Sequence, residues 1–308
     1  MKMFWQGLVT MLAAVVLAAC SSGSGGGSTG QLSLAVTDAP VDSALEVVVK
    51  FTKVELQPRD GDRITIEFDE VQEINLLDYQ GEDAFWLFEA EEVPAGEYNW
   101  IRLYVERNNA ADGPPASVFG TTSYVLFADN NLFFLAIPSG PQTGLKLVGG
   151  FTVVAGETTK LVIDIDLRRA LVKPSSDIWA DYYFLRPALR LVDHSEVGHL
   201  AGTVAVDNCE PAIYVYLGDN ALPGDICEGN DCSEDVDRPL TTTLANYNEL
   251  GQIWEYKIGF LPAGSYTAAV TCDALADDPD QDDEIEFIDQ QNVEIFAGET
   301  TVADFPSE

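Results

Sequence analysis

The sequence is poor in histidine and in basic residues. His194 and His199 are its two histidines, and 16 lysines and arginines stand against 51 aspartates and glutamates, a net charge of −35. That balance excludes the basic footprint of a nucleic-acid-binding protein. The sequence has no phosphate-binding loop, and the spacings Gly-x-Ser-x-Gly and Gly-x-Gly-x-x-Gly occur only within the Ser/Gly run at 25–30, which lacks the strand and helix that a nucleophile elbow or dinucleotide fingerprint needs. We therefore expect a protein that is not an enzyme.

The N-terminus lacks an apolar run long enough to cross a bilayer, which needs about 20 residues. Residues 8–19 are apolar except for Thr10, and the run ends in Leu17-Ala18-Ala19-Cys20. This ending resembles the lipobox of bacterial lipoproteins, in which the cysteine thiol receives a diacylglycerol and becomes the new N-terminus. The resemblance implies a signal peptide over residues 1–19 and a membrane partner reached through lipidated Cys20. The alternative is an ordinary secretory signal with a chance cysteine.

A Ser/Gly tether follows the cysteine. Residues 21–30 read SSGSGGGSTG, a composition typical of a flexible linker with a reach of roughly 17 Å. Ser21 stands where well-studied Gram-negative lipoproteins of the inner membrane carry an aspartate. The resemblance therefore favours the outer membrane of a Gram-negative bacterium.

Acidic charge is concentrated in the second half. Residues 196–308 hold 25 acidic side chains and only two basic ones, a net charge of −23, so that −12 remains for the first part. One interpretation is a solvated acidic surface suited to saline surroundings. The other is that this half binds cations, with calcium as the candidate cofactor.

Beyond Cys20, the cysteines all lie in the second half. An even number in an exported protein indicates disulfides. We prefer a short loop closed by Cys227 and Cys232 and a link between two strand ends by Cys209 and Cys272. Zinc is the weaker alternative, because no histidine lies near these thiols.

Period-two alternation dominates the chain after residue 30 and predicts strands separated by Pro- and Gly-containing turns. Helical patterns are few, over residues 82–90 and 167–172. The predicted fold is mainly β, with two β-sandwich-like domains in tandem, the first containing one or two short helices. We expect these domains over residues 31–193 and 197–305, after a lipidated cysteine and tether at 20–30.

Two motifs occur once in each half. The sequence VPAGEY at 93–98 reappears as LPAGSY at 261–266, and each is followed by AGETT, at 155–159 and 297–301. Pro and Gly build a turn, and the tyrosine opens the next strand. Because the spacing between the motifs is unequal, gene duplication and independent reuse of one turn both remain open.

Ordered landmarks in the first half resemble a bacterial lipoprotein family, the domain of unknown function 4382. They are LSLAVTDAPV at 32–41, VPAGEYNWIRLYV at 93–105, IPSGPQTGLKL at 137–147, LVIDIDL at 161–167 and YFLRPALRL at 183–191. The resemblance implies location and architecture, whereas the biochemical role of that family is open. The second half resembles a carboxypeptidase-regulatory or transthyretin-like β-sandwich, through LAGTVAV at 200–206 and LPAGSYTAAV at 261–270.

Three patterns could carry chemistry. Asp164 and Asp166 alternate on a strand and could pair with Arg102, as a structural ion pair or as catalytic carboxylates. Tyr214 and Tyr216 alternate with aliphatic residues, so their rings could form an outward sugar-stacking platform or simply cover the sheet. Every second residue in one loop is acidic, as in a calcium loop, although glycine is missing where an EF-hand needs it: Asp278, Asp280, Asp282 and Glu284.

These observations predict a non-catalytic, lipid-anchored envelope protein that acts as a surface or periplasmic binding module, with a glycan or an envelope protein as partner. The alternative is a structural or spacer lipoprotein that binds calcium on its acidic C-terminal domain and takes no small ligand.

Overall fold

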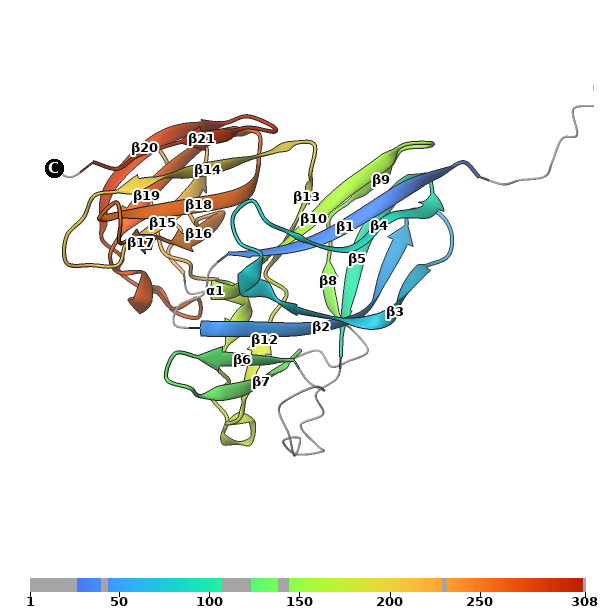
Figure 1. Ribbon diagram of the computed structural model, residues 1–308, viewed down its shortest axis with the longest axis horizontal. Coiled ribbons are helices and arrows are strands. Elements are labelled where there is room, and N and C mark those ends of the chain that lie inside the picture. Colours follow the sequence, from blue (N-terminus) through green and yellow to red (C-terminus); the bar gives the residue numbers. More distant parts are fainter. Residues whose placement is uncertain (1–26, 40–43, 107–122, 138–143, 229–231, 307–308) are drawn as a thin grey trace, which may run out of the picture.

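The strands and short helices of the chain form two β-sandwiches that lie side by side (Figure 1). The computed structural model describes residues 27–39, 44–106, 123–137, 144–228 and 232–306. The predicted fold class, mainly β with tandem sandwiches, is confirmed. No helix within these described ranges has the length and apolarity that crossing a bilayer requires.

The first sandwich consists of sheets A and B. Sheet A has the order β13 (Leu189–Asp193), β10 (Thr158–Asp166), β1 (Thr29–Ala39) and β4 (Phe85–Pro94). Sheet B runs β11 (Leu171–Val172), β12 (Tyr182–Leu185), β7 (Leu132–Ala136), β6 (Tyr124–Phe127), β2 (Ala44–Pro58), β5 (Gly96–Val105) and β8 (Leu145–Leu147). Two further strands join sheet B, β3 (Ile64–Asn75) on β2 and β9 (Phe151–Val153) on β5.

The second sandwich consists of sheets C and D. Sheet C has the order β17 (Asn246–Asn248), β18 (Ile253–Pro262), β14 (Val197–Val204) and β21 (Thr300–Val302). Sheet D has the order β16 (Thr241–Leu244), β15 (Ala212–Leu217), β19 (Gly264–Thr271) and β20 (Phe287–Ile295). Helical turns lie outside the sheets, at η1 (Leu76–Asp78), α1 (Leu167–Ala170), η3 (Asp177–Trp179) and η4 (Ala274–Ala276).

Each sandwich encloses its own apolar core, because alternate residues of its strands point inward. Leu34 of β1 and Ile163 of β10 face Leu56 of β2 across the first core, and all three are fully buried. Ile213 and Val215 of β15 face Leu200 of β14 across the second core. The strands that the period-two alternation predicted therefore supply the residues of both cores.

The two segments with helical patterns fold differently from the prediction. Residues 82–90 were expected to be helical, but β4 occupies most of that range and pairs antiparallel with β1. Burial of Leu87 and Val93 on sheet A outweighs the local helical pattern. Residues 167–172 form only the single turn α1, capped by the Asp166 carboxylate, before the chain continues as β11.

The two repeated sequence motifs build the same arrangement in both halves. Gly96 and Gly264 adopt positive φ angles of 144° and 154° in the β4–β5 and β18–β19 turns, where glycine is needed. The following tyrosines reach back across these turns. The Tyr98 hydroxyl donates to the Pro94 carbonyl over 2.7 Å, and Tyr266 donates to Pro262 over 2.6 Å.

Each AGETT motif forms a hydrogen bond to the first strand of its half. The Gly156 amide donates to the Thr29 carbonyl over 2.9 Å, and Gly298 donates to Val197 over 2.8 Å. The strands that follow run parallel to β1 and β14, respectively. The first half has β6–β9 between its two motifs, whereas the second has η4 and β20, which accounts for the unequal spacing. The two halves thus share an arrangement as well as a turn.

A small apolar contact joins the sandwiches. Val197 and Phe260 of sheet C pack with Ala35, Val162 and Val192 on the outer side of sheet A. The connection between the halves is the short turn from the end of β13 to the start of β14. The two sandwiches therefore meet directly and are not separated by a long linker.

Candidate functional site

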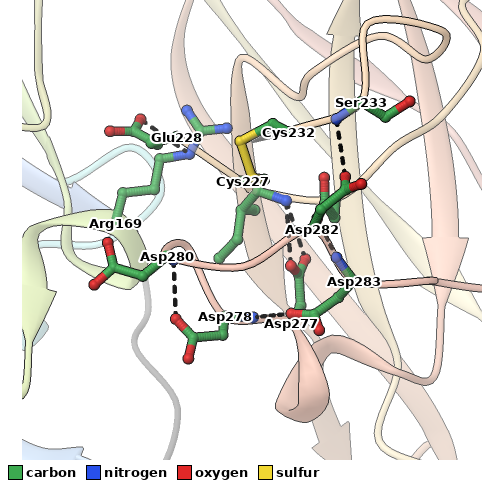
Figure 2. Close-up of a disulfide and its surroundings, with 12 residues drawn as sticks. Arg169, Cys227, Glu228, Cys232, Ser233, Asp277, Asp278, Asp280, Asp282 and Asp283 are labelled. Carbon is green, nitrogen blue, oxygen red and sulfur yellow. Dashed lines mark hydrogen bonds and ion pairs between the residues drawn. A yellow bond between two sulfur atoms is a disulfide. The ribbon is translucent and has the colours of Figure 1, made fainter. Parts of the chain in front are cut away.

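Three carboxylates converge in an acidic corner of the second sandwich, defined here as Asp225, Asp277 and Asp283. Ligand oxygens of the three lie within 4.8 Å of one another, and Asp225 and Asp277 are buried. The Cys227–Cys232 disulfide, shown in Figure 2, constrains the loop just after Asp225. The helical turn η4 ends just before Asp277. Buried carboxylates at this separation repel each other unless a proton, a donor or a cation is shared between them.

Backbone amides hold the acidic corner in place. The Asp283 amide donates to Asp225 over 2.7 Å, and the Ile226 amide donates to Asp277 over 3.2 Å. The Asp278 amide donates to the Asp283 carboxylate over 2.8 Å (Figure 2). Burial raises the pKa of Asp277, although hydrogen bonds from Tyr214 and Ile226 partly counteract it. The corner thus has the donor type of a hard-cation site, with some oxygens already engaged by the protein.

The four carboxylates predicted as a calcium loop do not come together. Asp278 accepts hydrogen bonds from the Asp280 amide and from Gln281 within its own loop. Asp280 turns toward Arg186 at 2.6 Å, and Asp282 accepts from the Ser233 amide over 3.0 Å. In an extended segment every second side chain points to the same side but lies about 7 Å further along, so only a tightly curved loop would gather all four. The predicted calcium loop, which also included Glu284, is therefore wrong as a set of ligands. The acidic corner replaces it as the candidate cation site.

The predicted sugar-stacking platform is wrong. Tyr214 and Tyr216 point away from the second core, as alternation indicated, yet both are completely buried. They pack with Ala221, Ile226 and Ala274, which belong to segments that cover the outer side of sheet D. The Tyr216 hydroxyl donates to the Gly224 carbonyl over 2.6 Å. No ring face of either tyrosine is available to a sugar.

Tyr214 instead links the sandwiches through Arg168 of α1. The Arg168 guanidinium donates to the Tyr214 hydroxyl over 2.9 Å and to Thr242 over 3.1 Å, and it also reaches the Ala274 carbonyl. The Tyr214 hydroxyl in turn donates to Asp277. A buried arginine of the first half is thereby connected to the acidic corner of the second.

The candidate catalytic carboxylates Asp164 and Asp166 are engaged in an ion pair and in a helix cap, respectively. Arg190 donates to Asp164 over 2.6 Å, whereas the predicted partner Arg102 lies on sheet B. Asp166 caps α1 and lies 3.5 Å from Arg169, and burial raises its pKa. The pairing with Arg102 is therefore wrong, because Asp164 is paired with Arg190 of the neighbouring strand β13, whereas Arg102 lies 3.8 Å from Glu55 on sheet B.

The histidines belong to the contact between the sandwiches. The ring of His194 lies 5.9 Å from that of Trp86, and the ring of His199 lies 5.4 Å from that of Phe260. His199 accepts a hydrogen bond from the Phe260 amide over 3.3 Å, and burial lowers its pKa. Both side chains thus pack at the junction between the two sandwiches.

The disulfides join Cys209 to Cys272 and Cys227 to Cys232, the pairing that the sequence analysis preferred. Cys20 and the segment before it lie outside the described residues, so the predicted lipid attachment is untested.

The sequence analysis missed Arg168, Asp225, Asp277 and Asp283. Asp225 stands two residues before Cys227, so the disulfide could have pointed to it. Asp277 and Asp283 belong to the acidic loop, but counting every second residue from Asp278 passes over both. Arg168 gave no signal, because its partners lie 46 to 106 residues away in the sequence.

The fold and these contacts define a two-sandwich β protein in which the buried Arg168 connects the two sandwiches. The chain belongs to the family described as a domain of unknown function, DUF4382, whose profile matches residues 29–187. No curated protein matches the chain.

Solved structures show only remote similarity. The chain is 14% identical to the Bacillus anthracis TIE protein, with a TM-score of 0.19, over 90% of this chain and 33% of that one. It thus spans about a third of the length of that protein. Proposed cell adhesion proteins from Bacteroides fragilis and Parabacteroides distasonis are 9% and 11% identical, with TM-scores of 0.20 and 0.23. They match over 89% and 90% of this chain and 92% and 93% of theirs. At these values none of the three supports a transfer of topology or function.

Proposed function

We propose that this chain is a lipid-anchored, non-catalytic binding module of a bacterial cell envelope. The observation that carries the proposal is the lipobox-like ending at residues 17–20, and the start of β1 agrees with it. Strand β1 begins at the end of the first sandwich farthest from the second (Figure 1). Just before it, the Ser28 carbonyl accepts a hydrogen bond from the Ala95 amide. An anchor at Cys20 would therefore hold the molecule at one end, with the strongly acidic second half outermost.

Lipidation is tested by expressing the full chain in a Gram-negative host supplied with radiolabelled palmitate. We expect label in the native chain and none in Cys20→Ser. The double variant Cys227→Ser/Cys232→Ser, which keeps Cys20, should still be labelled. Label that persists in Cys20→Ser would contradict the anchor.

The proposed outer-membrane location has its own test. Ser21→Asp should move the protein from the outer-membrane to the inner-membrane fraction of a density gradient, because an aspartate after the lipidated cysteine retains lipoproteins of this type. An inner-membrane location of the native chain would contradict the proposal.

We also propose that the second sandwich is of the transthyretin-like or carboxypeptidase-regulatory type, as its sequence resemblance implies. The contacts of Asp164 and Asp166 support a role other than catalysis. A glycan array probed with the full chain in detergent, with and without calcium, separates a binding module from a spacer. Specific signals support the module, and a blank array favours the spacer.

The second candidate function is that of a spacer lipoprotein with calcium on its acidic half. The convergence of Asp225, Asp277 and Asp283 within 4.8 Å favours it over the predicted loop. Isothermal titration of the full chain with calcium should give saturable heat, which Asp225→Asn removes. The control Asp280→Asn should leave that heat unchanged. No heat at millimolar calcium would end this candidate.

A further inference from the structure

One face of sheet B gathers positive charge in a chain that is otherwise strongly acidic. Lys53 of β2, Arg102 of β5 and Lys146 of β8 alternate with buried core residues, so they point outward together. Arg102 lies directly opposite Lys146 in the strand register. Arg63, just before β3, joins them, and these four are a quarter of the 16 lysines and arginines of the chain.

Two aromatic rings hold these cations together. The Trp100 ring centroid lies 4.8 Å from the Arg102 guanidinium, 4.9 Å from the Lys146 ammonium and 5.2 Å from the Arg63 guanidinium. Lys53 lies 4.5 Å from the centre of the Tyr104 ring. Like charges repel, but the negative face of an aromatic ring attracts each of them. Trp100 therefore acts as a common partner for three cations.

A buried carboxylate fixes the centre of the face. Glu55 accepts hydrogen bonds from the Tyr104 hydroxyl over 2.9 Å and from Arg63 over 3.1 Å. Burial alone would raise the pKa of Glu55, but the Tyr104 hydrogen bond and the neighbouring cations lower it, so the carboxyl is charged at neutral pH. Glu67 lies opposite Lys53 on the neighbouring strand. Among these residues the four cations still exceed the two carboxylates, and Arg63 and Lys146 are exposed.

We propose that this surface, here called the Trp100 face (Lys53, Glu55, Arg63, Glu67, Trp100, Arg102, Tyr104 and Lys146), binds an acidic polysaccharide through the carboxylates of its uronic acid residues. The inference rests on the proposed function as a binding module and names its ligand class. Arginine and lysine are suited to carboxylates. The row from β3 to β8 crosses four strands, about 14 Å at 4.8 Å per spacing, which suits a ligand with several charges better than a single ion.

The surroundings of the Trp100 face favour a narrow chain over a flat membrane surface. Asp60 and Asp62 are exposed in the turn between β2 and β3, three to five residues after Gln57, which lies opposite Trp100 in the strand register. A planar anionic membrane that reached the cations would also approach these carboxylates and be repelled, since such charges act over a Debye length of about 8–10 Å. A single polysaccharide chain that follows the row from β3 to β8 brings fewer charges near these carboxylates than a planar surface does.

The test uses the full chain in detergent micelles and measures binding of galacturonic acid oligomers by isothermal titration. The fully methyl-esterified oligomer, which has lost its charges, is the ligand control. Arg63→Gln/Lys146→Gln removes the two exposed cations of the Trp100 face. Its matched control, Arg238→Gln/Lys257→Gln, removes one arginine and one lysine exposed in the second half.

We expect the native chain to bind the acid and not the ester, with affinity falling as NaCl rises from about 50 to about 500 mM. The Arg63/Lys146 double variant should bind at least about tenfold more weakly, and the control double variant within about twofold of the native chain. No binding of the acid, or equal binding by the native chain and the Arg63/Lys146 variant, would overturn the inference.

A lipid headgroup is the competing occupant. If phosphatidylglycerol in the micelle displaced the oligomer from the native chain, the Trp100 face would be a lipid site and the inference would fail. The two proposals can fail separately. If the chain is labelled with palmitate and the array gives signals for neutral glycans alone, the proposed function holds and this inference fails.

Discussion

Arg168 shows how much depends on a single buried charge. It is only 4% exposed, and it comes from α1 of the first sandwich while Tyr214, Thr242 and Ala274 belong to the second. A buried guanidinium is stable only when its donors are satisfied, because the charge has lost its hydration. Both sandwiches must therefore be folded and in contact for Arg168 to be satisfied.

We expect Arg168→Met to lower the free energy of unfolding by about 3–5 kcal/mol, the usual cost of removing one partner from a buried charged network. Arg186→Gln removes a half-exposed ion pair with Asp280 and should cost about 1 kcal/mol or less. Urea denaturation measures both. Equal losses in the two variants would contradict the role given to Arg168.

A double-mutant cycle tests the connection from Arg168 to Asp277 through Tyr214. The double variant Arg168→Met/Asp277→Asn should be less destabilised than the sum of its single variants, because the remaining partner no longer carries a buried charge. Strict additivity would show that the two residues act independently.

Elements rather than single residues explain the likeness of the two halves. In each half, the first strand pairs antiparallel with the strand before the Pro-Ala-Gly turn and parallel with the strand after the AGETT motif. The sequence revealed both motifs but not that they meet on the same strand. Pairing between segments far apart in the chain depends on the path of the intervening residues, which local patterns do not encode.

The two disulfides should stabilise the second sandwich unequally. The loop-entropy model gives about 4 kcal/mol for Cys209–Cys272, separated by 63 residues, and about 2 kcal/mol for Cys227–Cys232, separated by five. Urea denaturation of the two double alanine variants measures the difference. A larger loss from the Cys227→Ala/Cys232→Ala variant would mean that the short disulfide acts mainly by holding the acidic corner together.

Net charge acts on the molecule as a whole. With 51 acidic and 16 basic side chains, self-repulsion disfavours the compact state, most of all in the second half. Only a few ion pairs interrupt this repulsion within the described residues of that half, among them the contact of Asp280 with Arg186. The net charge also gave no indication of the cations on the Trp100 face, because a net charge is a sum over the whole chain and does not say where charges cluster on the surface.

Salt should therefore stabilise the protein. Raising NaCl from about 20 mM to about 1 M reduces the Debye length to about 3 Å, and we expect Tm to rise by a few degrees, about 2–4 °C per kcal/mol. Calorimetry with a chelator present keeps calcium out of the comparison. A Tm that falls with salt would show that exposed ion pairs such as Arg59–Glu97 outweigh the net repulsion.

The sequence by itself determined the β class, the inward residues of the strands and the turns at Gly96 and Gly264. These are local properties, set by a period of two and by the backbone freedom of glycine. Only the tertiary structure decided what covers each outward face. Tyr214 and Tyr216 point outward from the second core, yet the loops over sheet D bury them. Trp100 and the cations around it lie on a part of sheet B that no other segment of the described residues covers. Such cover depends on the path of distant segments, which alternation within one strand cannot specify.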